Sequence, residues 1–305
     1  MAEIYFYAES EKQSRNLTAC IQDSGNIACA LCLGSNIAPS TKNCGADKIV
    51  CLEGEDASPE RYAKALAVYL TERNAAALLA ESTVRGREIA ALVAGFMDAP
   101  MLSDISRCEI RADEFFCEHI IYGGMMLRTS TVKGFVIATV QSGFHERDAA
   151  EKEVAVIERI VAEDVDTRVQ VLSREDVIKT GVDLAAAPVT VCAGLGIQEM
   201  GDLSLLEELA SICGGAICCT RGVSEDRGWL STEQYIGISG KILSPELYLG
   251  VALSGQIQHT YGIRGAKTVA AINIDGNAPI VRASDYALIG DYREVVPAFV
   301  AALKK

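Results

Sequence analysis

The residues best suited to chemistry lie in the last third of the chain, in short loops that follow apolar segments. Residues 254–259 (SGQIQH) follow the strand-like run ELYLGVAL and lead into an expected helix. A glycine at such a junction lets the backbone approach a ligand, and free N–H groups there favour an anion or an electron-rich ring. Residues 237–240 form a second permissive loop with a hydroxyl at Ser239, and Asn273 and Asp275 close the next strand. Together these loops predict a nucleotide-type cofactor.

Two single residues stand out, and each has a structural alternative. His259 is one of only three histidines, and it is either a ligand-facing group or a core histidine with a satisfied hydrogen bond. Arg221 follows the buried run GAICC directly, and it either faces a ligand or forms a surface salt bridge. The segment 82–87 (STVRGR) could hold a phosphate, although a helix-capping turn is the better interpretation.

Other motifs argue against several enzyme classes. The step Gly194-Leu195-Gly196 resembles part of a dinucleotide fingerprint, but the third glycine is missing because position 199 is Glu. This weakens the interpretation as a nicotinamide-dependent dehydrogenase. The chain has no GxxxxGK[ST], HExxH or GxSxG sequence, so it lacks the P-loop, zinc-peptidase and nucleophile-elbow signatures.

The eleven cysteines are interpreted as packing residues. Most lie inside apolar runs, where a free cysteine behaves as a small buried hydrophobe in a reducing compartment. Cys29 and Cys32 have the spacing of a redox motif, but alternation along a strand would point them to opposite faces of the sheet. No second CxxC completes a zinc or iron–sulfur site, and we expect no metal.

The order of elements predicts an α/β fold with two domains. Four apolar runs of strand length alternate with helical patterns over the first ~105 residues, which indicates a parallel sheet covered by helices. Residues 108–142 read as an antiparallel extension, and 143–187 as one or two edge strands followed by a linker. A second α/β series begins near 188 and ends in a helix near 293–303. We therefore expect a nucleotide-binding-like domain at 1–187 and a doubly wound domain at 188–305.

Length and charge narrow the function further. The chain has 305 residues, with 28 Lys and Arg against 41 Asp and Glu, a net charge of −13. Such an acidic chain without a basic run is a poor ligand for nucleic acid or an anionic membrane. No apolar stretch reaches the ~20 residues of a membrane span, and residues 1–10 lack a signal peptide's basic start. We expect a cytoplasmic protein without stable membrane insertion.

The C-terminal motifs resemble a known family. The segments CTRGVSEDRGW, QYIGISGK, SPELYLGVALSGQIQH, AINIDGNAPI and SDYALIGDYREVVP are similar, in order and spacing, to the FAD domain of electron-transfer flavoprotein alpha subunits. A fainter similarity extends over the whole chain. The GISG and SGQIQH versions resemble the branch associated with carnitine and other acyl-CoA reduction pathways.

The resemblance implies a site residue by residue. Thr220 and Arg221 match a pair beside the flavin ring, and residues 236–239 match a loop whose hydroxyl, here Ser239, faces the ring. Residues 254–259 match a loop whose histidine, here His259, lies near the ring's pyrimidine side. Arg221 and His259 would stabilise negative charge on the reduced ring and favour one-electron steps. With Asp275 from the strand-end pattern, the predicted cofactor-binding residues are Thr220, Arg221, Ile236, Gly237, Ile238, Ser239, Ser254, Gly255, Gln256, Ile257, Gln258, His259, Asn273, Asp275, Asp291 and Tyr292.

The resemblance also implies a function. The chain would be an electron carrier without bond-making chemistry of its own, binding FAD and forming a heterodimer with a beta subunit that its first domain contacts. It would pass electrons between an acyl-CoA dehydrogenase or related enzyme and another redox partner, and any AMP or second FAD would belong to the beta subunit. Leu195, Ile238 and Ile274 depart from the family's usual Arg, Gln and Lys. They leave open a non-redox nucleotide module with a decayed FAD site.

Overall fold

The computed structural model forms two compact units, Met1–Asp176 and Val177–Lys305. The predicted boundary lay between residues 187 and 188, but Leu184 and Ala187 are buried in a core cluster of the second unit. Part of the predicted linker lies outside the described residues. The structure describes residues 1–54, 58–111, 114–122, 125–141, 144–145, 147–163, 165–166, 168–169, 172–173, 183–184 and 186–304.

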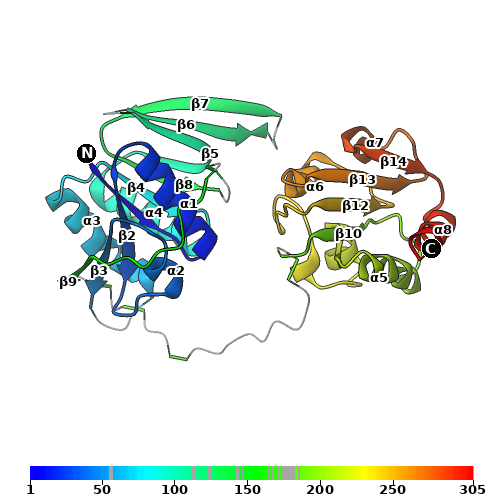
Figure 1. Cartoon of the computed structure of the whole chain (residues 1–305), viewed down its shortest axis with the longest axis horizontal. Helices are drawn as coiled ribbons and strands as arrows, with labels where there is room; N and C mark the ends of the chain where they lie inside the picture. Colours follow the sequence, from blue (N-terminus) through cyan, green and yellow to red (C-terminus); the bar gives the residue numbers. More distant parts are fainter. Residues whose placement is uncertain are drawn as a thin grey trace. The chain divides into compact units, whose positions relative to one another are not determined.

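The first unit is built on a nine-stranded sheet with the order β7-β6-β5-β8-β4-β1-β2-β3-β9 (Figure 1). The predicted parallel core is confirmed, because β1 pairs in parallel with β2 and β4, and β2 with β3. The predicted edge strand is β9, which pairs in parallel with β3. The strands are β1 (Glu3–Tyr7), β2 (Ile27–Leu33), β3 (Lys48–Glu53), β4 (Ala77–Glu81), β5 (Met101–Arg111), β6 (Glu114–Ile121), β7 (Met126–Lys133), β8 (Val136–Val140) and β9 (Ile157–Val161).

The antiparallel extension is confirmed in part. Strands β5, β6 and β7 pair antiparallel in sequence order. Strand β8, which was predicted to belong to this extension, instead pairs in parallel with β4 and β5 inside the sheet. All five of its residues are buried, and a strand buried on both faces suits the interior of a parallel sheet rather than an exposed hairpin.

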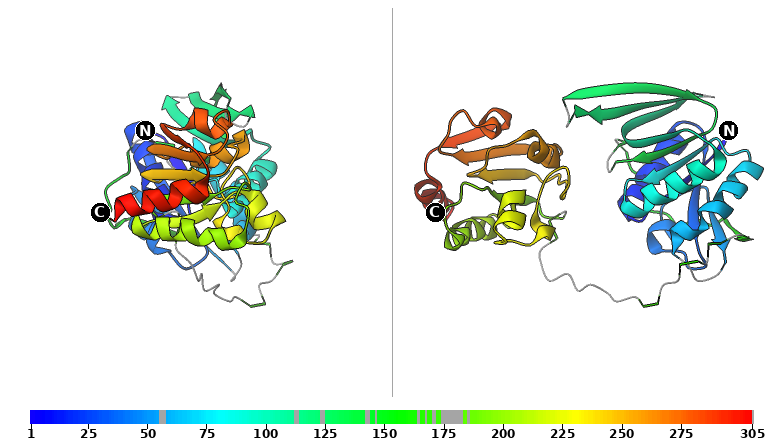
Figure 2. Two further views of the ribbon diagram at one scale, coloured as in Figure 1. Left: turned by 90° about the vertical axis from the view of Figure 1, so that its right-hand side faces the viewer. Right: turned by 180° about the vertical axis from the view of Figure 1, so that it is seen from behind.

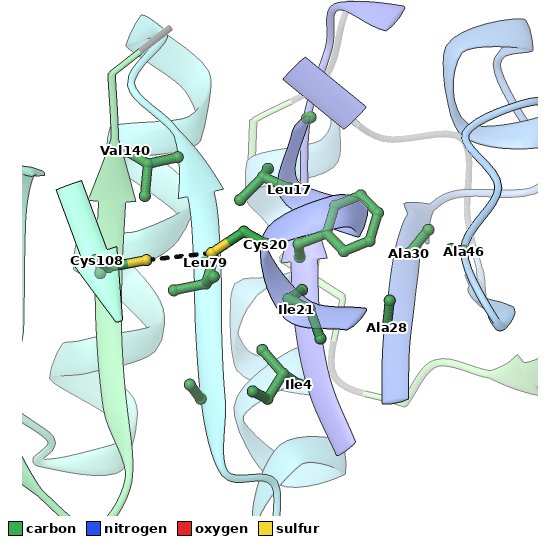
Figure 3. Close-up of a cluster of buried hydrophobic side chains, with 14 of the residues drawn as sticks. Ile4, Leu17, Cys20, Ile21, Ala28, Ala30, Ala46, Leu79, Cys108 and Val140 are labelled. Atoms are coloured by element: carbon green, nitrogen blue, oxygen red, sulfur yellow. Dashed lines mark hydrogen bonds between the residues drawn. The ribbon is translucent and has the colours of Figure 1, made fainter. Parts of the chain in front are cut away.

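Helices cover both faces of this sheet. One core cluster packs α1 (Glu11–Asp23) on the sheet, and Figure 3 shows its Cys20 directed at Cys108 of β5, with 3.5 Å between the sulfurs. The other cluster holds η1 (Pro59–Tyr62), α3 (Ala63–Glu72) and α4 (Val84–Met97). A short helix, α2 (Pro39–Lys42), follows β2.

The cysteines behave as packing residues. All eleven are free thiols, and ten of them are buried. Cys29 and Cys32 belong to different core clusters, so they lie on opposite faces of the sheet as strand alternation predicts.

Strands β1 and β4 lie at the point where the first sheet's strand order reverses. Here the buried carboxylate of Glu81 accepts hydrogen bonds from the backbone N–H groups of Glu9 (2.7 Å) and Ser10 (3.0 Å) and from the Ser10 hydroxyl (2.8 Å). Thr83 caps α4 by accepting from Gly86 N–H at 3.0 Å. The capping interpretation of residues 82–87 therefore agrees with the structure.

We expect Glu81→Gln to destabilise the first unit by about 2 kcal/mol, because a charged acceptor with three donors becomes a neutral amide that can meet fewer of them. The measurement is urea unfolding of the full chain by circular dichroism. Glu88→Gln, on the exposed face of α4, is the matched control and should change the free energy of unfolding by less than about 0.5 kcal/mol. Equal effects at the two positions would contradict this role of Glu81.

The second unit has a five-stranded sheet in which every pairing is parallel, with the order β11-β10-β12-β13-β14. Helices α5 and α8 lie side by side on one face (Figure 2, left), while α6 and α7 pack on the other. The predicted doubly wound fold is confirmed. The elements are β10 (Val189–Ala193), η3 (Met200–Asp202), α5 (Leu203–Ile212), β11 (Ala216–Cys219), η4 (Gly222–Asp226), η5 (Thr232–Gln234), β12 (Leu247–Val251), α6 (Ile257–Thr260), η6 (Tyr261–Ile263), β13 (Thr268–Asn273), α7 (Pro279–Ala283), β14 (Tyr286–Ile289) and α8 (Tyr292–Leu303).

The strand order of the second sheet reverses between β10 and β12, because β11 lies on one side of β10 and the later strands follow on the side of β12. In open α/β sheets, ligands bind beyond the carboxyl ends of the strands at such a point. No helix in the described part of the chain combines the length and apolar character that a membrane crossing requires.

Candidate functional site

A large cavity lies at the carboxyl ends of the second sheet, with a volume of about 960 Å³. Its walls come from the residues that follow all five strands, including the reversal point between β10 and β12. Cofactor sites are concave and range over about 300–1,000 Å³, so this cavity has the size and place expected for an extended cofactor.

Fifteen of the sixteen residues predicted from the sequence line this cavity, and Ile257 is the exception. All three departures from the family pattern line the cavity: Leu195, Ile238 and Ile274. The lining residues that the sequence prediction did not name are Gly196, Gln198, Gly222, Asp226, Tyr235, Ala252, Leu253, Ile272, Ala278, Pro279 and Gly290.

Glycines shape the junctions at the reversal point. Gly255 has a φ of 74°, and a Cβ built on it would lie 2.5 Å from the backbone of Ile280. A Cβ on Gly194 would lie 2.1 Å from the carbonyl oxygen of Ala252. Ala252 itself has a φ of 53°, which is unusual for a residue with a Cβ. The two loops therefore approach each other as closely as their backbones allow.

The loop after η5 is tied to the loop that carries His259. The backbone N–H of Ile238 donates to the carbonyl oxygen of Gln258 at 2.9 Å. Gly237, with a φ of 150°, lies against the same carbonyl. The hydroxyl of Ser239 shares a hydrogen bond with the phenol of Tyr235, so a tyrosine four residues earlier orients the hydroxyl that the sequence singled out.

His259 is buried at 8% exposure and lines the cavity. Its Nε2 lies 2.7 Å from the hydroxyl of Tyr248 and 3.9 Å from the sulfur of Cys192. Its Nδ1 is buried and has no hydrogen-bond partner among the described residues. The expected alternative, a core histidine with satisfied hydrogen bonds, therefore accounts for only one of the two ring nitrogens.

Thr220 and Arg221 follow β11 at the same rim. The Thr220 hydroxyl oxygen is buried and has no hydrogen-bond partner among the described residues. The Arg221 guanidinium is exposed and pairs with Glu225 at 2.6 Å, and this hydrogen bond raises the pKa of Arg221 above its usual value. The surface ion pair, one of the two interpretations of Arg221, is present, and Arg221 also lines the cavity.

The residues after β13 and β14 hold the far wall in place. Asn273 donates from its amide to the carbonyl of Leu253 at 2.7 Å and accepts from the N–H of Asp275 at 3.0 Å. The Asp291 side chain caps α8 by accepting a hydrogen bond from the backbone N–H of Arg293, the second residue of the helix, at 2.9 Å. The Tyr292 hydroxyl donates to Asp202 and accepts from a backbone N–H after β10. These side chains position the cavity wall through contacts within the protein.

The three departures from the family pattern leave a rim with apolar side chains and little positive charge. Leu195, Ile238 and Ile274 are 49%, 50% and 76% exposed. Among the described residues that line the cavity, Arg221 is the only one with a permanent positive charge, whereas three aspartates line it. The phosphates of a dinucleotide would therefore be bound mainly by backbone N–H groups and hydroxyls.

In the described part of the chain, no group of three or more His, Cys, Asp or Glu side chains could hold a metal ion. The sequence prediction missed Tyr235 and Ala252 because their roles depend on neighbours across loops. The one available signal was the tyrosine at the start of the loop YIGISG.

Comparison with known proteins identifies relatives of both units. Residues 183–264 match the family model described as electron transfer flavoprotein FAD-binding domain, and residues 19–165 match the electron transfer flavoprotein domain. Protein FixB of Salmonella typhimurium is 31% identical over 312 residues, covering 100% of this chain and 99% of FixB. The Escherichia coli K12 protein named "Putative electron transfer flavoprotein subunit YdiR" is 31% identical over 307 residues, covering 99% of this chain and 98% of that protein.

Proposed function

This chain belongs to the electron transfer flavoprotein alpha-subunit family, and we propose that it binds FAD in the cavity of its second unit and acts as an electron carrier. Two buried polar atoms at that cavity carry the proposal, because neither has a hydrogen-bond partner in the described part of the chain: Nδ1 of His259 and Oγ1 of Thr220. A buried polar atom without a partner costs free energy unless a ligand satisfies it.

The shape of the cavity supports the same cofactor. Gly194 and Gly255 let their loops pack closely against the backbones of Ala252 and Ile280, where a Cβ would clash, and this close packing shapes the edge of the cavity. The wall is a mixture of aliphatic side chains and a few convergent polar groups, which is the composition expected of a site for a flat aromatic ring.

Bound FAD would supply the ability to accept and donate electrons one at a time. The chain's own residues would bind and orient it. His259 and Arg221 would offer a hydrogen-bond donor and a positive charge to the electron-rich side of the ring. The hydroxyl of Ser239, oriented by Tyr235, would provide a further polar contact.

We further propose that the chain works as a heterodimer with a beta subunit and exchanges electrons with an acyl-CoA dehydrogenase or a related redox enzyme. Family membership supports a beta-subunit partner and dehydrogenase partners in general. Any AMP or second FAD is assigned to the beta subunit. A cytoplasmic location accords with the eleven free thiols, because thiols persist in a reducing compartment.

A second candidate is a non-redox nucleotide module, which the apolar rim of Leu195, Ile238 and Ile274 favours. The visible spectrum of the full chain, copurified with its beta subunit and then reduced stepwise, separates the two. A flavin spectrum that responds to reduction supports the electron carrier. A colourless complex that rejects added FAD supports the module. Binding of NAD(P)H to the chain would instead favour a nicotinamide dehydrogenase.

We expect Leu195→Arg to tighten FAD binding by about tenfold, because it adds a positive charge to a rim that holds three aspartates and one arginine. Fluorescence titration of the FAD-free complex measures the dissociation constant. Leu195→Met, which keeps an apolar side chain of similar size, is the control and should leave the constant unchanged. Weaker binding by the arginine variant would mean that the phosphates lie elsewhere.

A further inference from the structure

A buried tyrosine that does not line the cavity contacts the cavity-lining histidine His259. Tyr248 lies on β12 and Cys192 on β10, and both are 0% exposed. The Tyr248 hydroxyl is 2.7 Å from Nε2 of His259, and the Cys192 sulfur is 3.9 Å from the same nitrogen. Tyr248 is absent from the cavity lining, and its hydroxyl contacts a lining side chain at His259.

The chemistry of these three groups indicates where the proton of a neutral His259 ring resides. Burial raises the pKa of Tyr248 well above its usual value, so the phenol keeps its proton and can donate it. A phenol O–H is a stronger donor than a thiol S–H, and the Tyr248 oxygen lies at full hydrogen-bond distance from Nε2 (2.7 Å), whereas the Cys192 sulfur is 3.9 Å away. The best pairing is therefore Tyr248 O–H to Nε2, which places the ring proton on Nδ1.

We propose that Tyr248 is a positioning residue that holds neutral His259 in its Nδ1–H form. The nitrogen left as a donor is then the one with no partner among the described residues. The step in which this donor serves a cofactor rests on the proposed function. The tautomer itself does not, because it follows from contacts within the protein. A tyrosine that only packed the core would leave the tautomer ratio unaffected.

The test is the tautomer of His259 in the full chain without FAD. The chain has three histidines, so ¹⁵N-histidine labelling gives three ring spin systems in two-bond ¹H–¹⁵N spectra, and loss of one set in His259→Gln assigns His259. Burial lowers the pKa of His259 and the neighbouring Cys192 raises it, and the net pKa lies above the usual histidine value of about 6.5. The spectra are therefore followed to alkaline pH until the ring is neutral, and in that form we expect proton-bearing Nδ1 and unprotonated Nε2. A dominant Nε2–H form in the unmodified chain would overturn the proposal.

Tyr248→Phe supplies the second arm. It removes only the hydroxyl, and we expect the Nε2–H form to gain about fivefold, the size of one net hydrogen bond. Tyr286→Phe, at a position 70% exposed on β14, is the matched control and should change nothing. An unchanged ratio in Tyr248→Phe, with the fold intact by circular dichroism, would reduce Tyr248 to a packing residue. If that variant does not fold, the tautomer of His259 in the unmodified chain still tests the proposal.

A third readout separates this proposal from the proposed function. In the FAD-loaded complex, we expect Tyr248→Phe to shift the midpoint potential in the same direction as His259→Gln, by a smaller amount. A complex that binds no FAD would refute the proposed function and leave the tautomer result standing. An Nε2–H tautomer in a complex that does bind FAD would refute the role of Tyr248 alone.

Discussion

Replacing Gly255 with alanine is expected to weaken FAD binding by about 100-fold. The backbone there has a φ of 74°, and the new Cβ would lie 2.5 Å from the Cα of Ile280. A left-handed conformation costs a residue with a Cβ about 1–2 kcal/mol, and overpacking against backbone costs about 1–3 kcal/mol. If the bound conformation becomes less favourable by about 3 kcal/mol, the dissociation constant rises by about two factors of ten. FAD content per chain after copurification with the beta subunit measures it.

The control for this variant is a second glycine at the same cavity edge of the sheet. Gly276 has no positive φ, and its nearest neighbours would lie 3.9 Å from an added Cβ. Gly276→Ala should therefore retain its FAD. Circular dichroism of both variants separates loss of the cofactor from loss of the fold. Full FAD content in Gly255→Ala would show that this loop is not part of the binding site.

Local pattern was enough to predict most elements and the region of the site. Apolar runs of strand length identified β1 to β4 and β10 to β13, because a buried parallel strand is apolar on both faces. The residues that line the cavity were predicted from the loops at the strand ends together with the resemblance to a known family. Ile257 shows that a matching segment does not predict the position of every residue within it. It belongs to the matching SGQIQH loop, yet it does not line the cavity.

The features that escaped prediction depend on contacts between distant residues. Strand β8 directly follows the antiparallel strands in the sequence, but it inserts between β4 and β5, and periodicity carries no information about strand order. Cys192 reaches His259 across 67 positions of sequence. Tyr248 appears in the sequence as one more apolar residue of a buried strand. Only the fold brings its hydroxyl to the ring nitrogen.

Replacing His259 with alanine is expected to lower the midpoint potential of bound FAD by about 60–120 mV. Reduction places negative charge on the ring, and a hydrogen bond to a charged group contributes about 1.5–3 kcal/mol. For one electron, each factor of ten corresponds to about 59 mV. Nδ1 of His259 is buried and has no hydrogen-bond partner within the described ranges, so it is the donor that would make this bond.

Reductive titration against a reference dye measures that potential in the complex with the beta subunit. His119→Ala is the matched control, because it removes a histidine from β6 in the first unit that does not line the cavity. Its potential should equal that of the unmodified complex. If His259→Ala also leaves the potential unchanged while FAD stays bound, the imidazole does not stabilise the reduced ring. Among the described residues that line the cavity, Arg221 then remains as the group that offers a positive charge.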